Sequence, residues 1–264
     1  MNSFQLHQPK DLAAASALAA SGGDTRFLAG GQSILASMKL GLASPDAMID
    51  LSQIPDLKSI SVSGGVVKIG AMVKHADVAA NADVQKAIPA LAELAGGIGD
   101  RQVRNMGTIG GSLANSDPAA CYPAAALGLG ATIHTSKRNI AADSFFLGLY
   151  ETALEAGEII TAVSFPVPEK AAYVKFKNSA SRFALVGVFV SKGAQGVRVA
   201  VTGAGSCAFR VADLEKALAA SWTAAACNAV KVTADNLNSD LHASAEYRAH
   251  LIPVIAGRAV AAAK

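Results

Sequence analysis

The fold is decided by one stretch of the sequence, IGDRQVRNMGTIGGSLANSDPAA, which covers residues 98–120. Its centre holds a pair of glycines between two hydroxyl residues, Thr108-Ile-Gly-Gly-Ser112. A similar pair occurs earlier, in Ala29-Gly-Gly-Gln-Ser33, next to a predicted strand. Glycine lets backbone amides approach an anion closely, and successive N–H groups in a turn form a positively polarised hollow without lysine. Either segment alone is typical of an ordinary turn, but together they predict two loops that hold a pyrophosphate.

A third glycine motif lies further on, in Gly203-Ala-Gly205-Ser-Cys-Ala208, which follows a predicted strand and precedes a helix. It matches part of the dinucleotide-binding fingerprint. Three features argue against that function: the preceding strand pairs in a predicted hairpin, two residues delay the helix, and the next acid, Asp235, is too distant. A plain turn from strand to helix is the favoured interpretation.

The first 55 residues predict one small α/β unit. Helical patterns cover residues 10–21 and 33–40, and short strands cover 25–29 and 47–51. A hairpin follows over 57–63 and 66–70, with its turn at Gly64-Gly65. Further helices are expected over 74–80 and 82–95, and another begins at Pro118 with Asp117 as its cap.

Two prolines mark a domain boundary. The predicted strand 159–165 runs into Pro166 and Pro168, which cannot continue a hydrogen-bonded ladder. Beyond them, strands over 171–176, 185–190 and 197–202 predict an antiparallel sheet, and helices follow over 211–220, 223–230 and 244–263. Pro253 is expected to kink or interrupt the last helix. The predicted class is α+β, with one domain over 1–166, made of lobes of about 1–55 and 56–166, and a second over 167–264.

Composition excludes several kinds of protein. The 264 residues are 52% hydrophobic and only 16% charged, which excludes disorder. The net charge of +3 and the interspersed signs make nucleic acid an unsuitable partner. The start lacks a secretory signal, no segment reads as transmembrane, and three scattered cysteines argue for a reducing, cytoplasmic location. Neither the cysteines nor the five histidines have the spacing of a metal or iron–sulfur site.

Together these segments resemble the FAD-binding medium subunit of molybdenum hydroxylases, of the carbon monoxide dehydrogenase and xanthine dehydrogenase type. The resemblance rests on residues 29–33 with Met38-Lys39, on residues 98–120, and on Ser244-Ala-Glu-Tyr-Arg-Ala-His-Leu251. It therefore covers almost the whole chain. It implies a two-lobed FAD-binding domain of the PCMH or vanillyl-alcohol-oxidase type, followed by a small C-terminal domain with an antiparallel sheet and helices.

The resemblance also implies where FAD is bound, without a covalent bond. Its pyrophosphate would lie on the backbone of residues 29–33 and 108–112, and its flavin ring near residues 115–118 and near a lysine best matched by Lys175. The cofactor-binding residues would be Ala29, Gly30, Gly31, Gln32, Ser33, Thr108, Ile109, Gly110, Gly111, Ser112, Asn115, Asp117 and Lys175. The family often has a second aspartate where this chain has Cys121, so no carboxylate is offered to the flavin there.

By the same resemblance, the chain is an electron-transfer subunit with no catalytic side chain and no metal of its own. A molybdenum-cofactor large subunit would oxidise the substrate, and a small subunit with [2Fe-2S] clusters would relay the electrons to this FAD. The acceptor would be a quinone, oxygen or NAD, and the assembly a dimer of heterotrimers. The low charged fraction would leave apolar surface for these partners. Two alternatives remain open: a self-contained FAD-dependent oxidoreductase of the same fold, and a cofactor-free scaffold subunit.

Overall fold

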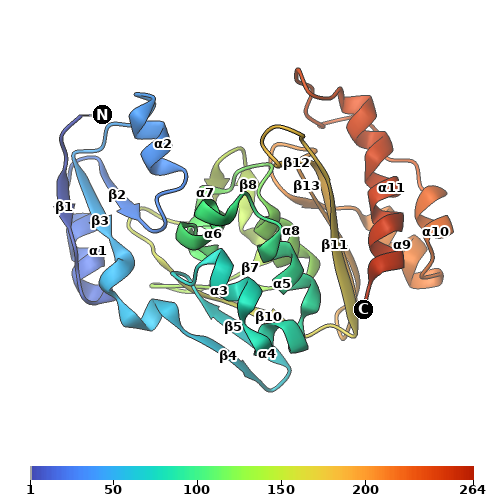
Figure 1. Cartoon of the computed structure of the whole chain (residues 1–264), viewed down its shortest axis with the longest axis horizontal. Coiled ribbons are helices and arrows are strands. Elements are labelled where there is room, and N and C mark those ends of the chain that lie inside the picture. The colour runs from blue at the N-terminus through green and yellow to red at the C-terminus, as the bar shows by residue number, and fades with distance from the viewer. Residues whose placement is uncertain (1) are drawn as a thin grey trace.

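Three larger sheets, each built by one part of the chain, lie side by side along the longest axis of the molecule (Figure 1). The computed structural model describes residues 2–264. The first sheet belongs to the N-terminal unit, the second to the middle of the chain, and the third to the C-terminal part.

The N-terminal unit is a parallel sheet of three strands in the order β1-β3-β2. Its elements are β1 (Gln5–His7), α1 (Leu12–Ala20), β2 (Thr25–Leu28), α2 (Ile34–Lys39) and β3 (Ala47–Asp50). Helix α1 begins after Asp11, whose carboxylate accepts a hydrogen bond from the N–H of Ala14 at 2.8 Å. The predicted α/β unit is confirmed, and β1 is an additional strand of three residues that carries no clear periodicity.

The middle of the chain builds an antiparallel sheet in the order β4-β5-β10-β6-β7. After two short 3-10 turns, Leu51–Gln53 and Pro55–Lys58, its strands are β4 (Ile60–Ser63), β5 (Val66–Gly70), β6 (Thr132–Thr135), β7 (Asn139–Ala141) and β10 (Ile160–Pro166). A 3-10 turn (Ala142–Ser144) and a small pair of strands, β8 (Phe146–Gly148) and β9 (Glu151–Thr152), precede β10. The predicted hairpin is confirmed, and its turn takes φ values of 56° and 74° at Gly64 and Gly65.

Six helices connect β5 to β6. They are α3 (His75–Ala80), α4 (Ala82–Ala87), α5 (Pro89–Gly96), α6 (Arg101–Met106), α7 (Ile109–Asn115) and α8 (Cys121–Gly128). The single helix predicted over 82–95 is wrong, because Pro89 disfavours helical backbone at Ile88 and starts a new helix, α5. The helix expected to begin at Pro118 begins instead at Cys121, since the Asp117 carboxylate accepts from the N–H of Ala119 and holds a turn there.

The C-terminal part is an antiparallel sheet in the order β11-β12-β13-β14, with three helices after it. The elements are β11 (Lys170–Lys177), β12 (Ala184–Gly193), β13 (Gly196–Thr202), β14 (Phe209–Arg210), α9 (Ala212–Ala220), α10 (Ala224–Asn228) and α11 (Ala245–Ala262). The predicted strands and helices are confirmed. Pro253 does not interrupt α11, in which it is buried with Leu251, Ile252 and Ile255, so packing outweighs the missing hydrogen bond.

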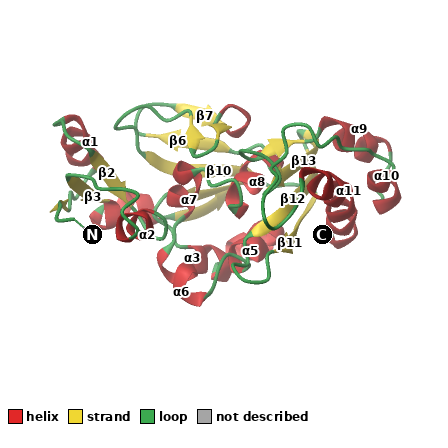
Figure 2. Ribbon diagram, turned by 90° about the horizontal axis from the view of Figure 1, so that it is seen from above, coloured by secondary structure: helices red, strands yellow, loops and turns green. Residues whose placement is uncertain are grey.

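This C-terminal sheet lies between helices on both faces, as Figures 1 and 2 show. Along β12, Val186, Val188 and Val190 pack with α9 and α11 on one face, whereas Phe189 belongs to the core that contains α5 and α8 on the other. Strand β13 alternates in the same way, with Val199 towards α11 and Ala200 towards α8. The boundary near residue 166 stays a prediction, but this sheet links the parts on either side of it.

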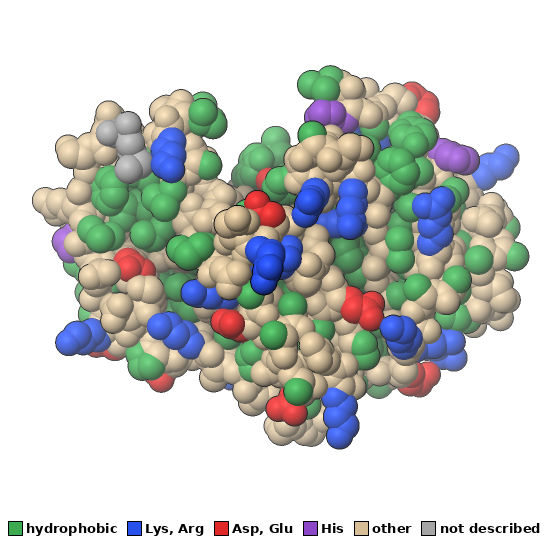
Figure 3. Space-filling model, in the orientation of Figure 1, with side chains coloured by type: hydrophobic (Ala, Val, Ile, Leu, Met, Phe, Trp, Pro, Cys, Tyr) green, Lys and Arg blue, Asp and Glu red, His purple; other side chains and the backbone are tan. Residues whose placement is uncertain are grey.

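On the face shown in Figure 3, Lys and Arg side chains are spread over the surface, several of them near its centre, and Asp and Glu side chains lie among them. Within residues 2–264, no helix is long and apolar enough to cross a membrane. Cys121, Cys207 and Cys227 are all free thiols.

Candidate functional site

A cavity of about 720 Å³ lies where the N-terminal unit, the middle of the chain and the C-terminal part meet. Its wall takes residues from the loop after β2, from the segment 98–121, from residues 154–160 and from β11 with the loop that follows it. Every residue predicted for the site lines this cavity except Ile109. The Ile109 side chain is fully buried in the core instead, and its N–H donates to the carbonyl of Val73 at 3.1 Å.

The first glycine segment is an open loop with free backbone donors. It connects β2 to α2, and Gly31 takes a φ of +70°, a left-handed conformation that favours glycine. Within the described residues, the N–H groups of residues 30–33 donate to no acceptor of the protein. Four adjacent unpaired donors in one loop of a cavity wall form a hollow suited to a phosphate group.

Gly30 is required for a different reason, which is the packing of this loop on the chain behind it. A Cβ atom at Gly30 would collide with the carbonyl oxygen of Met106 and lie 2.7 Å from Cα of Gly107. The loop therefore rests directly on the end of α6. Sequence reasoning assigned both glycines to ligand approach, but only Gly31 has the backbone conformation of a binding turn.

The second glycine segment is not the open loop that we predicted. Gly110 and Gly111 lie in the first turn of α7, which follows the N-cap residue Thr108. Their N–H groups are already used: Gly110 donates to the carbonyl of Ala71 at 2.9 Å, and Gly111 to the Thr108 hydroxyl oxygen at 3.2 Å. The N–H of Ser112 likewise donates to the Thr108 carbonyl at 3.0 Å.

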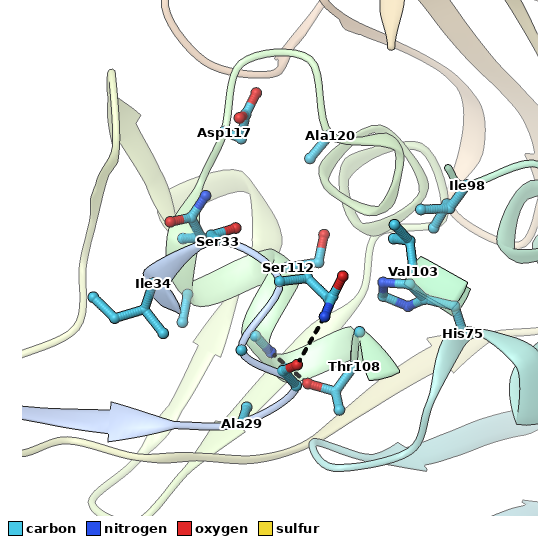
Figure 4. A pocket seen from close by; sticks show the side chains of 18 of the residues that line it. Ala29, Ser33, Ile34, His75, Ile98, Val103, Thr108, Ser112, Asp117 and Ala120 are labelled. Atoms are coloured by element: carbon cyan, nitrogen blue, oxygen red, sulfur yellow. Dashed lines mark hydrogen bonds between the residues drawn. The ribbon is translucent and has the colours of Figure 1, made fainter. Parts of the chain in front are cut away.

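This segment consequently offers the cavity its hydroxyl groups in place of its backbone amides. Figure 4 shows Ser33, Thr108 and Ser112 around one hollow, with Ala29 beneath them. A Cβ atom at Gly111 would lie 3.4 Å from Cβ of Ala29, so α7 packs close to the first loop here. The two segments do meet, and the candidate groups for an anion are four amides from one and two hydroxyls from the other.

The cavity is also lined by Asn115, Asp117, Cys121 and Lys175. The ammonium group of Lys175 donates to the carbonyl of Gly97 at 2.9 Å and lies 3.4 Å from the sulfur of Cys121. Side chains alternate along β11, and Lys175 shares the cavity side of this strand with Tyr173, whereas Val174 faces α11. Lys175 thus brings one positive charge to the cavity wall.

Sequence reasoning missed several lining residues. His75 is buried beside the ring of Tyr122, and its burial, together with the charge of Arg104, lowers its pKa to about 4, so it is neutral at pH 7. The loop 180–183 between β11 and β12 also lines the cavity and includes Phe183, which is 50% exposed. Neither has a local motif, and both reach the site only through tertiary folding.

The comparisons with known proteins decide the family. Residues 2–168 match the family described as the FAD binding domain in molybdopterin dehydrogenase. The chain belongs to this family of FAD-binding domains. It is accordingly the FAD subunit of a molybdenum-containing oxidoreductase complex.

Relatives of this FAD subunit share its length as well as its sequence. The chain is 37% identical over 220 residues to the carbon monoxide dehydrogenase medium chain of Hydrogenophaga pseudoflava, which covers 78% of this chain and 77% of the relative. It is 36% identical over 251 residues to the nicotine 6-hydroxylase medium subunit of Paenarthrobacter nicotinovorans, over 90% and 89% of the two chains. The structure of a carbon monoxide dehydrogenase from Hydrogenophaga pseudoflava that lacks the Mo-pyranopterin moiety superimposes with a TM-score of 0.89 at 34% identity, covering 99% and 97%. The expected fold class is therefore confirmed.

Proposed function

We propose that the cavity between the three units holds FAD, with its pyrophosphate on the loop 29–33 and its flavin ring beside Asp117, Cys121 and Lys175. The observation that carries this assignment is the row of four unpaired N–H groups at residues 30–33. They can donate to phosphate oxygens, and the hydroxyls of Thr108 and Ser112 can donate from the facing wall. The volume of about 720 Å³ suits a cofactor of this size.

The chain passes electrons and selects no substrate. Bound FAD takes up electrons one at a time and gives them up singly or in pairs. The residues of this chain need only hold and tune the cofactor. We infer that the electrons come from [2Fe-2S] clusters of a small subunit and leave to an external quinone, oxygen or NAD. Because similar FAD subunits belong to enzymes named for carbon monoxide and for nicotine, the substrate is set by the molybdenum-cofactor large subunit.

The pyrophosphate assignment is tested by one substitution and a matched control. Gly31→Ala forces a Cβ atom onto a residue with φ of +70° in the loop, whereas Gly65→Ala does the same at φ of +74° in the distant β4–β5 turn. A Cβ atom at Gly65 meets nothing within 4 Å. Each substitution carries the strain of a left-handed non-glycine residue, about 1–2 kcal/mol. A Cβ atom at Gly31 would also lie 2.7 Å from Cδ1 of Leu35, the end of a flexible side chain, so Gly31→Ala should cost the same stability or slightly more.

Only Gly31→Ala should weaken FAD binding. Alanine keeps its N–H, but a change of φ away from +70° would turn that N–H away from the phosphate. Loss of one charge-assisted hydrogen bond in this way corresponds to about 1.5–3 kcal/mol, or roughly ten- to a hundredfold in the dissociation constant. The measurement is quenching of FAD fluorescence on addition of the apoprotein. Equal affinities of both variants for FAD would refute the assignment of the pyrophosphate to residues 30–33.

The assembly is proposed as a dimer of heterotrimers in the cytoplasm, and three free cysteines agree with a reducing compartment. Light scattering on the complex purified through a tag on this chain measures the stoichiometry. A self-contained FAD-dependent oxidoreductase would instead purify alone and be reduced by a small-molecule donor without partner subunits. Flavin reduction that requires the iron–sulfur subunit distinguishes the two.

A further inference from the structure

The end of strand β13 touches the back of the cavity wall. The turn 117–120 and the first residue of α8 line the cavity through Asp117, Ala119, Ala120 and Cys121. Behind that turn, the hydroxyl oxygen of Thr202 lies 2.7 Å from the carbonyl oxygen of Pro118 and 2.7 Å from that of Ala120. Thr202 is fully buried and does not line the cavity.

A second donor acts on the same turn. The N–H of Gly203 donates to the carbonyl of Pro118 at 2.7 Å. Gly203 has a φ of +84°, and a Cβ atom there would lie 2.8 Å from the carbonyl oxygen of Leu185, so no other residue fits. The carbonyl of Gly203 in turn accepts from the guanidinium of Arg248, a buried residue of α11, at 2.9 Å. The turn is thus fixed from the C-terminal part of the chain.

The same face of the sheet holds the opposite end of α8, away from the cavity. The hydroxyl of Ser191 donates to the carbonyl of Gly128, and Arg198 donates to that of Leu127 at 2.7 Å. Neither Ser191 nor Gly128 lines the cavity. Helix α8 is therefore held at both ends by similar buried hydrogen bonds, of which only one set acts on the cavity wall.

We propose that Thr202 is a positioning residue of the flavin site. Its hydroxyl fixes the turn 117–120 and the start of α8, and through them the place of Asp117 and Cys121 relative to Lys175. A hydroxyl has one proton, which the two carbonyls share, and no water competes for it because the group is buried. Removing it leaves the Pro118 carbonyl with the N–H of Gly203 alone and takes the Thr202 donor from the Ala120 carbonyl, so the turn is held less firmly. This inference rests on the proposed binding of the flavin ring beside that turn.

The test compares Thr202→Val, which keeps the shape without the hydroxyl, with Thr202→Ser, which keeps the hydroxyl. Ser191→Ala is the control, because it removes a similar buried hydrogen bond at the other end of α8. The full chain is titrated with FAD by fluorescence quenching, and the absorption spectrum and midpoint potential of the bound flavin are recorded. Thermal unfolding without FAD measures stability.

Thr202→Val is expected to raise the FAD dissociation constant about tenfold, the equivalent of one buried hydrogen bond, and to shift the flavin spectrum and potential. Thr202→Ser should restore all three to near the wild-type values. Ser191→Ala should lose a similar amount of stability and leave the flavin unchanged. If Thr202→Val does not fold, Thr202→Cys replaces it, with a weaker donor and an intermediate effect expected.

Two outcomes separate the inference from the proposed function. Wild-type protein that binds no FAD would refute the proposed site itself. Wild-type protein that binds FAD, together with a folded Thr202→Val or Thr202→Cys variant whose affinity, spectrum and potential are all unchanged, would refute the positioning role alone.

Discussion

Two adjacent glycines of α7, alike in the sequence, should respond very differently to the same substitution. A Cβ atom at Gly110 would lie 2.6 Å from Cβ, 2.7 Å from the carbonyl oxygen and 2.9 Å from Cα of Ala71. Most of these are backbone or near-backbone atoms that cannot rotate away. A Cβ atom at Gly111 would have its closest contacts at 3.0 Å, with the Thr108 hydroxyl, and at 3.4 Å, with Ala29.

The magnitudes follow from two opposing effects. Alanine is favoured over glycine in a helix by about 0.8–1 kcal/mol. Overpacking against a rigid neighbour costs about 1–3 kcal/mol, and at Gly110 we take the upper end because backbone is involved. Gly110→Ala should therefore destabilise the protein by about 2 kcal/mol and lower the melting temperature by about 4–8 °C, whereas Gly111→Ala should change it by about 1–2 °C at most.

The assay is thermal unfolding of the full chain followed by circular dichroism, with and without FAD. Ala71→Gly supplies a further check, since it removes the 2.6 Å contact and should restore part of the stability lost in Gly110→Ala. Equal melting temperatures for Gly110→Ala and Gly111→Ala would refute the argument that close packing on Ala71 selects the first glycine.

Three further predictions concern charge and the flavin. Burial opposes ionisation of Glu158, but hydrogen bonds from Arg138, the N–H of Glu155 and Thr135 lower its pKa to about 2 from its ordinary 4.5. The ionised Glu158 side chain contributes its full stabilisation above pH 4.5, and this stabilisation is lost as the pH falls towards 2. The melting temperature of Glu158→Gln should therefore fall less between pH 4.5 and 2 than that of the wild type. Parallel plots of melting temperature against pH for the two proteins would contradict this. Lys175→Met should lower the midpoint potential of the bound flavin, measured by spectroelectrochemical titration, because a nearby positive charge stabilises the reduced form. Lys177 lies on the same strand but is exposed outside the cavity, so Lys177→Met should leave the potential unchanged. Acid precipitation should release all flavin from the wild type and from Cys121→Ser alike, and retention of flavin by the wild-type pellet alone would reveal a bond to Cys121.

Much of the fold could be predicted because local sequence patterns determine many of its strands, turns and helix ends. The alternation of β11 to β13, the Gly64-Gly65 turn and the glycine stops of the helices are all short-range signals. The position of Lys175 also followed from family resemblance, and its direction agrees with the period of two along β11. These elements depend little on the rest of the chain.

The conformation of the second glycine segment could not be predicted, because its partners are distant in sequence. Gly110 donates to Ala71, almost forty residues earlier, and this contact converts an expected turn into the first turn of a helix. His75 and the loop 180–183 reach the cavity in the same way. A pair of glycines indicates that another group comes close to the backbone at that point. The sequence does not show whether that group is a ligand or another part of the chain.

The C-terminal sheet, buried on both faces, limits how this protein can be cut. The family match ends at residue 168, yet Phe189 and Ala200 complete the core around α8, and Thr202 holds the turn in front of that helix. A fragment excised at that point would lose one wall of its cavity and expose an apolar helix to water. For expression, domain exchange or the grafting of this flavin module onto another enzyme, the transferable piece must therefore include the C-terminal sheet.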